Sequence, residues 1–209
     1  MIAVVDYGAG NLRNVRKALE HIGAHVLVTS DPSALEHAEK IVLPGVGAFA
    51  DCRQGLIDRN LFEPLRALAQ NGKPLLGICV GMQLLFEVGE EMGEWPGLGL
   101  IRGRVVRFEG AAFQGHNALK VPHIGWNQLH IVQPTHAFVR HIAEGSYAYF
   151  VHSYHAHVEE PACVLATAHY GYDFPAVVAK GNVWGVQFHP EKSQEVGLRF
   201  LRNFVFGET

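Results

Sequence analysis

Charged residues are scarce in this chain. Of its 209 residues only 18% are Asp, Glu, Lys or Arg, whereas 48% are hydrophobic. The formal net charge is −3 and no face-sized excess of Lys or Arg appears, so we expect no nucleic-acid partner. No apolar run reaches the length of a membrane span and the segment starting at Met1 lacks a basic region, so we expect no membrane partner and no targeting segment.

Cysteine is also scarce, with only Cys52, Cys79 and Cys163. An odd, widely spaced set of three excludes a disulfide framework and a paired-cysteine zinc site. It is typical of a reducing compartment, so we expect a cytoplasmic protein.

Histidine, by contrast, is plentiful, with 13 residues, and three of them (His152, His155 and His157) alternate near the end of an expected strand. Alternation predicts that these three share one face, where an incidental surface metal site is an alternative. No Cys-x-x-Cys, His-Glu-x-x-His or carboxylate cluster supplies a recognisable set of ligands. We therefore expect no metal and no cofactor.

The hydrophobic pattern predicts an α/β fold in one domain over residues 1–209. A chain of this length can bury a substantial core, and no repeat, linker or low-complexity stretch divides it. Short β-branched runs alternate with helical patterns, which indicates a mostly parallel sheet with helices on both faces. In the first half we expect strands at Ile2 to Asp6, His25 to Thr29, Lys40 to Leu43 and Leu75 to Ile78, and helices at Leu12 to Ile22, from about Ala48, and at Leu61 to Gly72.

In the second half the expected strands are closely spaced, which is typical of a mixed or antiparallel extension. They are Arg104 to Phe108, Leu119 to Val121, Tyr147 to His152, Cys163 to His169, Ala176 to Ala179 and Val183 to Phe188. Residues 109–117 are expected to form an irregular insert. A final helix, Val196 to Val205, is expected to turn Leu198, Leu201 and Phe204 inward.

The segment from Pro74 to Gln83 carries the chain's best nucleophile candidate, Cys79. Gly77 and Gly81 stand two residues before and after it. A side chain at the tip of a sharp strand-to-helix turn needs such neighbours, because the flanking backbones pass too close for a Cβ. The apolar residues after Gly81 predict a helix whose N-terminus favours the thiolate. A buried structural cysteine is the alternative that this motif alone leaves open.

A second segment, Val183 to Ser193, supplies the chemistry that a cysteine nucleophile needs. An apolar strand ends at His189, and Glu191 follows after Pro190. Proline restricts His189 to extended geometry, so its ring can reach a neighbouring strand end while the carboxylate orients it. We expect a Cys79-His189-Glu191 triad, in which His189 moves the proton and Glu191 fixes the tautomer.

Three segments resemble the signatures of class I (triad) glutamine amidotransferases. They are Gly77 to Gln83, Pro44 to Gly47 and Phe188 to Glu191. The segments Asp6 to Asn11 and Pro122 to Asn127, together with Met82-Gln83, further resemble the glutaminase subunits of imidazole glycerol phosphate synthases, and the match runs the whole length. The resemblance implies a flavodoxin-like, three-layer α/β fold.

The resemblance implies hydrolysis of L-glutamine to glutamate and ammonia through a thioester on Cys79. Val46 and Val80 would be the oxyanion donors, and the Val46 peptide could flip when a partner binds. Donors of this kind can contribute ~3 to 4 kcal/mol each. The residues expected to bind the substrate are Gly47, Gln83, Glu91, Ser153 and Tyr154.

The plain alternatives for the substrate residues are a solvated helix end at Glu90 and Glu91 and a half-buried core position for Tyr154. The Pro44 to Gly47 turn, taken alone, could be an ordinary strand-to-helix loop.

The resemblance further implies a heterodimer with a (β/α)8-barrel cyclase subunit, to which the ammonia is channelled. In that family the cyclase makes imidazole glycerol phosphate and an aminoimidazole carboxamide ribonucleotide, a step of histidine biosynthesis. Asn11, Asn14, Pro122 and Trp126 would lie at the interface, although Trp126 could instead be a core residue.

Two other kinds of function share parts of this pattern. A stand-alone hydrolase, or an amidotransferase serving anthranilate or GMP synthesis, would share the cysteine turn but not Met82-Gln83 and the segment His123 to Asn127. A non-catalytic interaction module on the same fold would normally have lost Cys79, His189 or Glu191, and all three are present.

Overall fold

The centre of the molecule is an eight-stranded sheet in the order β2-β1-β3-β4-β14-β13-β12-β9. The computed structural model describes residues 1–207. The five strands from β2 to β14 are parallel, and β13, β12 and β9 extend the sheet with antiparallel pairing. Their bounds are β1 Ile2–Val5, β2 Val26–Thr29, β3 Lys40–Gly45, β4 Leu75–Cys79, β14 Val183–Val186, β13 Asp173–Lys180, β12 Val164–His169 and β9 His130–Ile131.

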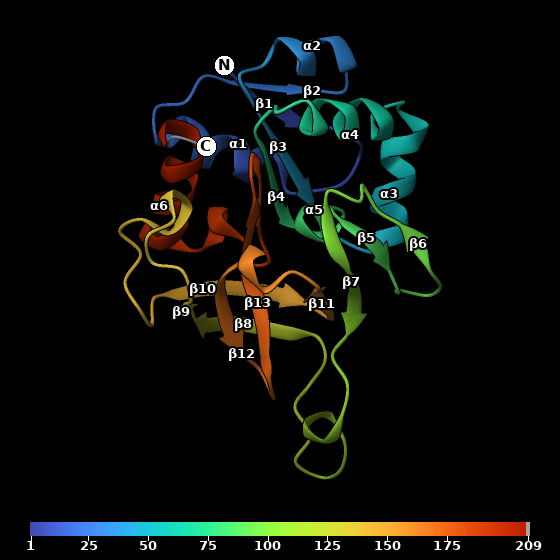
Figure 1. The fold of residues 1–209 in the computed structure, drawn as a ribbon, viewed down its shortest axis with the longest axis vertical. Helices are drawn as coiled ribbons and strands as arrows, with labels where there is room; N and C mark the ends of the chain where they lie inside the picture. The colour runs from blue at the N-terminus through green and yellow to red at the C-terminus, as the bar shows by residue number, and fades with distance from the viewer. Residues whose placement is uncertain (208–209) are drawn as a thin grey trace.

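Helices cover both faces of the parallel part (Figure 1). On one face α1 contacts α6, and on the other α4 contacts α2 and α3. Their bounds are α1 Leu12–His21, α2 Pro32–His37, α3 Phe49–Asp58, α4 Phe62–Gln70, α5 Val80–Gln83 and α6 Gln194–Phe206. The prediction of a mostly parallel, two-sided α/β fold with an antiparallel extension is confirmed.

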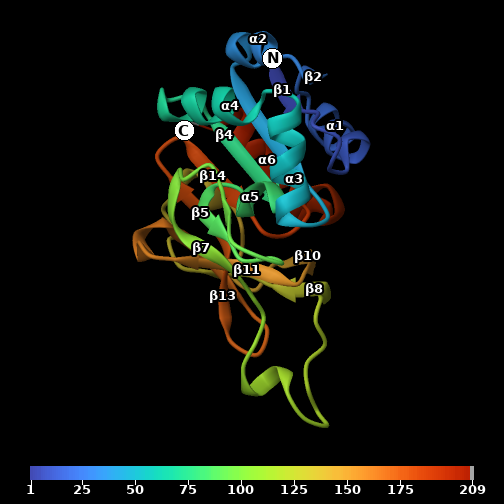
Figure 2. The ribbon, with the colours of Figure 1, turned by 90° about the vertical axis from the view of Figure 1, so that its right-hand side faces the viewer.

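Two smaller sheets lie beyond the carboxyl ends of the parallel strands (Figure 2). In one of them β8 (His123–Gln128) and β10 (Tyr147–His152) run antiparallel to each other. The other has the order β11-β7-β5-β6, with bounds β11 Tyr154–Val158, β7 Ile101–Arg107, β5 Phe86–Gly89 and β6 Trp95–Pro96. Short 3-10 helices occur at Ala111–Phe113, Ala137–Val139, Pro161–Cys163 and Pro190–Lys192.

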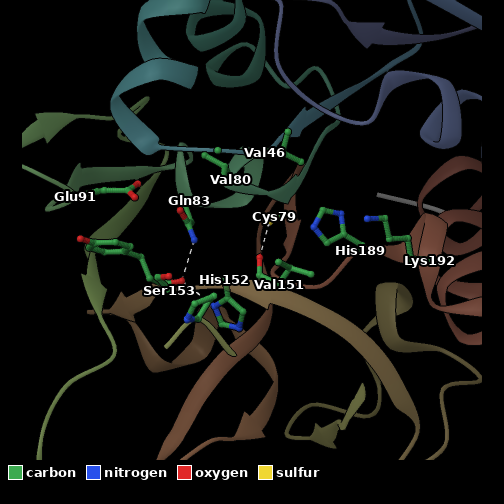
Figure 3. Close-up of a pocket in the computed structure, with 13 residues that line it drawn as sticks. Val46, Cys79, Val80, Gln83, Glu91, Val151, His152, Ser153, His189 and Lys192 are labelled. Atoms are coloured by element: carbon green, nitrogen blue, oxygen red, sulfur yellow. Dashed lines mark hydrogen bonds between the residues drawn. The ribbon is translucent and has the colours of Figure 1, made fainter. Parts of the chain in front are cut away.

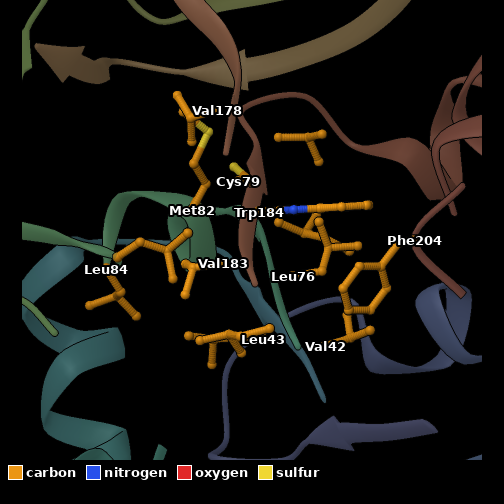
Figure 4. Close-up of a cluster of buried hydrophobic side chains, with 14 of the residues drawn as sticks. Val42, Leu43, Leu76, Cys79, Met82, Leu84, Val178, Val183, Trp184 and Phe204 are labelled. Atoms are coloured by element: carbon orange, nitrogen blue, oxygen red, sulfur yellow. The ribbon is translucent and has the colours of Figure 1, made fainter. Parts of the chain in front are cut away.

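The core is made by the parallel strands and the helices against them. Val42, Leu43 and Leu76 are buried between the layers together with Trp184 and Phe204 (Figure 4). Burying a side chain of this size contributes about 2 kcal/mol. In α6 the expected inward residues Leu201 and Phe204 are buried, and Leu198 is half-buried. This packing fixes the strand ends where the chemistry must take place.

Two local predictions are wrong. The helix expected after Cys79 ends at Gln83, and Phe86 to Gly89 form strand β5 instead, because this stretch pairs with β7. No strand forms at residues 119–121; the strand begins later, at His123. Ile124 and Trp126, large apolar residues at alternate positions, are the sequence signal that would have located β8.

The predicted insert at residues 109–117 is irregular in the structure. It holds the 3-10 turn Ala111–Phe113 and belongs to a loop that projects away from the rest of the molecule (Figure 1).

Candidate functional site

Cys79 lies at the carboxyl end of β4, where the chain turns sharply into α5. Its φ is 54° and its ψ is −113°, a combination that side-chain-bearing residues rarely adopt. The glycines around it are required sterically: a Cβ on Gly81 would overlap the Leu43 carbonyl, and one on Gly77 would lie 2.5 Å from the Gly81 oxygen. The sulfur-bearing turn predicted from the sequence is confirmed as a backbone feature.

The helix that follows Cys79 is only four residues long. A macrodipole grows with the number of aligned peptides, so α5 supplies much less thiolate stabilisation than the longer helix that the sequence led us to expect. The side chains around Cys79, rather than α5, are therefore the main source of the electrostatic field at the sulfur.

His189 reaches the same strand ends from β14, the parallel neighbour of β4. Gly185 is paired with Gly77 and Val186 with Ile78, so the chain after β14 passes beside Cys79. The His189 Nδ1–H donates to Glu191 Oε1 over 2.9 Å, and the two side chains are 5% and 1% exposed. Ser193 Oγ donates to the His189 carbonyl over 2.7 Å, which fixes the backbone of this segment.

The pKa of His189 reflects two opposing effects. Burial alone would lower it, but hydrogen bonds and charge interactions with Cys79 and Glu191 outweigh burial and raise the pKa to about 10. The imidazole is therefore charged near neutral pH, which is the state that pairs with a thiolate.

The third strand end at this place is the predicted oxyanion turn. Gly45 is paired with Cys79 in the β3–β4 register, and Gly47 has a φ of 91°. The Val46 side chain is 41% exposed, and the Cys52 thiol donates to its carbonyl over 3.2 Å. The Val46 and Val80 residues both border the space in front of the sulfur.

These strand ends surround a cleft of about 320 Å³ (Figure 3). It brings together the predicted nucleophile and base, both predicted oxyanion residues and all five predicted substrate residues. Glu191 lies behind His189 rather than in the lining. The lining residues are Val46, Gly47, Cys79, Val80, Gln83, Glu91, Pro122, Val151, His152, Ser153, Tyr154, His189 and Lys192.

Glu91 has a second contact besides the cleft. Its Oε2 accepts a hydrogen bond from the backbone N–H of Phe49, which is the first residue of α3. The alternative of a solvated helix end is wrong, because Glu90 and Glu91 follow strand β5 and Glu90 pairs with Arg104 over 2.7 Å. Tyr154 is half-buried against the core, as its plain alternative stated, and it also lines the cleft.

Sequence reasoning missed several residues at the cleft. Lys192 lines the cleft, and its position directly after Glu191 in the sequence could have indicated this. Val151 lines the cleft from the end of β10, beside His152. Gln187 is fully buried, and its Nε2 lies 3.9 Å from Cys79 Sγ; its position two residues before His189, across from the nucleophile's strand, was the signal available.

Three of the four predicted interface residues lie beside the segment that carries the base. Pro122 lines the cleft itself. Asn14 and Glu191 both line a second surface pocket, and Trp126 and Ser193 both line a third. Trp126 is 46% exposed, so the alternative of a core residue is wrong. Asn11 directly precedes α1, the helix that holds Asn14.

The expectation that His152, His155 and His157 share one face is wrong. His152 ends β10 and stands three residues before His155 of β11, so alternation does not place these two on a common face. His152 and His155 are buried, whereas His157 is exposed. Within residues 1–207 no three His, Cys, Asp or Glu side chains gather closely enough to hold a metal ion. No helix in the same range is long and apolar enough to cross a membrane.

Comparison with known proteins places these features in context. The family model for glutamine amidotransferase class-I matches residues 3–207. The imidazole glycerol phosphate synthase subunit HisH of Syntrophotalea carbinolica is 50% identical over 204 residues, covering 98% of each chain. The subunit of the same name from Geobacter metallireducens is 50% identical over 208 residues, covering 99% of this chain and 98% of its own. A solved glutamine amidotransferase has a TM-score of 0.74 at 21% identity, covering 98% of both chains, which shows the fold.

Proposed function

Because the chain belongs to the glutamine amidotransferase class-I family, we propose that its cleft hydrolyses L-glutamine and passes the ammonia to a cyclase subunit. The observation that carries this is the meeting of Cys79 with the His189–Glu191 pair at two adjacent strand ends in one cleft. Relatives that share 50% sequence identity with this chain carry the name of an imidazole glycerol phosphate synthase subunit. The product ammonia therefore serves histidine biosynthesis.

The first half of the reaction forms a thioester. The Cys79 thiolate attacks the side-chain amide carbon of glutamine, and the carbonyl oxygen becomes an oxyanion that faces the backbone N–H groups of Val46 and Val80. His189, charged through its contacts with sulfur and Glu191, gives its Nε2 proton to the leaving nitrogen. The C–N bond breaks, ammonia leaves and a γ-glutamyl thioester remains.

The second half restores the enzyme. The neutral His189 takes a proton from water, and the resulting hydroxide attacks the thioester carbon. The C–S bond breaks, the product leaves as the γ-carboxylic acid, which loses its proton to water to give glutamate, and the thiolate again faces an imidazolium. Glu191 holds the Nδ1–H tautomer throughout, so Nε2 is always the nitrogen that faces the substrate.

The amino-acid end of glutamine would be held on the side of the cleft away from His189. Glu91 is the acidic side chain of the lining and suits the ammonium group, while the backbone amides at Ser153 and Tyr154 suit the carboxylate. Gln83 and Gly47 complete this end.

The partner in this proposal is a (β/α)8-barrel cyclase that docks over Asn11, Asn14, Pro122 and Trp126. The position of three of these residues beside the segment 190–195 supports a shared face at the mouth of the cleft. We further propose that the chain is one amidotransferase domain, supported by a family match from residue 3 to residue 207. We also propose that it works in the cytoplasm, because its three cysteines form no disulfide bonds.

The test is glutamate release from L-glutamine, by the isolated chain and then with the cyclase and its nucleotide ligand. Strong stimulation that disappears in Cys79→Ala is the expected result. A fast isolated chain that the cyclase leaves unchanged would show an autonomous glutaminase, and release that survives Cys79→Ala would refute the thioester.

A further inference from the structure

A row of hydrogen-bonded groups, here called the histidine chain, connects strand β8 to the cleft. It consists of Asn127, His123, His152, the Tyr154 carbonyl and Gln83. The successive distances are 3.3 Å from Asn127 Nδ2 to His123 Nε2, 3.0 Å from His123 Nδ1 to His152 Nε2, 2.8 Å from His152 Nδ1 to the Tyr154 oxygen, and 3.0 Å from that oxygen to Gln83 Nε2. Both imidazoles are about 95% buried, being 4% and 5% exposed.

The outer end of the histidine chain has a fixed direction. Asn127 Nδ2 also donates to the His169 carbonyl over 2.8 Å, and Asn127 Oδ1 accepts from the Gln128 N–H over 2.8 Å. A reversed amide would lose both contacts, so Nδ2 is the atom that faces His123. Because Nδ2 can only donate, His123 Nε2 must be an acceptor, and the proton of a neutral His123 is on Nδ1.

The inner end gives the same direction independently. A carbonyl oxygen can only accept, so His152 Nδ1 carries the proton and donates to Tyr154. His152 Nε2 is then an acceptor, and the nitrogen that faces it is the protonated Nδ1 of His123. The two assignments meet in one consistent donor-to-acceptor sequence of two neutral imidazoles.

An additional proton would break the histidine chain wherever it bound. On His152 Nε2 it would face the Nδ1–H of His123, and on His123 Nε2 it would face the amide hydrogens of Asn127. Burial acts in the same direction, lowering the pKa of His152 to about 3 and that of His123 to about 4. The histidine chain therefore holds its groups in place and does not conduct protons.

At the cleft, this support sets the orientation of the Gln83 amide. Gln83 Nε2 uses its two hydrogens on the Tyr154 oxygen and on Gln187 Oε1, the latter over 3.2 Å. Its Oε1 has no hydrogen-bond partner among residues 1–207 and remains for a ligand in the cleft that Gln83 lines (Figure 3). Gln187 in turn directs its own Nε2 toward Cys79 Sγ.

We propose that His123 and His152, both neutral and protonated on Nδ1, are positioning residues that hold the Tyr154 carbonyl and the Gln83 amide in the geometry that binds glutamine. Neither imidazole donates to the substrate in this scheme. The effect on substrate binding rests on the proposed glutamine hydrolysis, whereas the tautomers can be tested without any activity.

His155 provides a matched comparison. It is also buried and packs against Phe108, as His152 does, with ring centroids 4.6 Å and 5.1 Å apart respectively. Its hydrogen bonds go to the Tyr172 hydroxyl and the Ala156 carbonyl, outside the histidine chain. A purely structural role would make the two histidines equivalent.

The kinetic test compares His152→Phe with His155→Phe, since phenylalanine keeps a ring and removes both nitrogens. We expect His152→Phe to raise KM for glutamine about tenfold, with kcat changed less than about threefold. His152→Asn, whose amide can replace the donor to Tyr154, should recover part of this loss. His155→Phe should leave KM within about twofold. Equal changes of KM in the two phenylalanine variants would overturn the proposal.

The second test is ¹⁵N NMR of histidine-labelled protein, with His123→Phe and His152→Phe used to assign the signals. Both imidazoles should be the Nδ1–H tautomer at pH 7 and remain neutral at pH 5.5. An Nε2–H tautomer or a charged ring at either position would refute the assignment. If the wild-type protein hydrolyses no glutamine, the proposed function fails while this test still decides the tautomers.

Discussion

Glu91 Oε2 and the Phe49 N–H form a 2.7 Å hydrogen bond, so a carboxylate of the cleft also caps helix α3. Glu91→Ala should therefore lose two functions, whereas Glu91→Gln keeps an acceptor for the helix and loses the charge. We expect Glu91→Ala to reduce the free energy of unfolding by about 1 kcal/mol. Glu91→Gln should unfold nearly like the wild type.

Both Glu91 variants should raise KM for glutamine about tenfold or more, since neither offers a charge to the ammonium group. Urea unfolding and steady-state kinetics on the same preparations separate the two roles. Unchanged KM in Glu91→Gln would remove Glu91 from the substrate site, and its cap would remain.

Backbone strain at Cys79 is the second testable feature. With φ at 54° and ψ at −113°, a residue with a Cβ is held in a sparsely populated region. Both Cys79→Ala and Cys79→Gly should be inactive, but the glycine variant should be the more stable by about 1 kcal/mol. Midpoints of urea unfolding compare them directly, and a less stable glycine variant would mean that the turn is unstrained.

Gly81 is confined by its surroundings, since a Cβ there would overlap the Leu43 carbonyl. Gly81→Ala should push α5 away from β3 and reduce the free energy of unfolding by about 3 kcal/mol or more. The control is Gly72→Ala, where φ is 91° but no atom lies within 4 Å of the added Cβ. That change should reduce stability by only about 1 kcal/mol.

Stability at high pH should depend on His189. Its pKa is raised to about 10 in the folded chain, above the ordinary value of 6.5, so the folded state holds this proton more tightly than the unfolded state. The stabilisation is fully present below pH 6.5 and decreases as the pH rises toward 10. Urea unfolding at pH 7 and pH 9.5 should show this decrease.

Glu191→Gln weakens the charge that holds the His189 proton, and its unfolding free energy should vary less over the same pH range. Its kcat should fall by a factor on the order of 10² or more, since the carboxylate no longer stabilises the imidazolium. A wild-type stability that is flat from pH 7 to pH 9.5 would contradict the raised pKa.

Stability at low pH should depend on the buried neutral histidines. The folded pKa is about 4 for His123 and about 3 for His152, below 6.5, so the unfolded state binds more protons as the pH falls from 6.5 toward 4. Their stabilisation is fully present above pH 6.5. We expect a loss on the order of 5 kcal/mol between pH 7 and pH 4.5, about half of it from each histidine. The double variant His123→Phe/His152→Phe should show a weaker pH dependence in chemical unfolding.

The strands and the sulfur-bearing turn could be predicted because their signals are local. Gly77 and Gly81 around Cys79 report a close approach of backbones, and the four first parallel strands are uninterrupted apolar runs. The prediction of a helix after Gln83 was wrong because the apolar residues there suit either an amphipathic helix or a buried strand. They are Leu84, Leu85, Phe86 and Val88. Only the pairing with β7 decides between the two.

The proposed triad follows from the sequence, whereas the support behind the cleft does not. His123 and His152 are 29 residues apart, and their hydrogen bond depends on how β8 pairs with β10. The cap from Glu91 to α3 likewise joins segments 42 residues apart. Neither contact leaves a pattern in composition or spacing.

The pairing of β4 with β14 gives the order in which activity can appear during folding. Cys79 is reached early along the chain, but the base comes from a strand more than a hundred residues later, and only the correct register brings them together. A chain that has folded its first half alone displays the nucleophile without a proton donor. Glutamine hydrolysis by the proposed triad therefore requires β14 to be paired with β4, so this activity reports that the long-range pairing has formed.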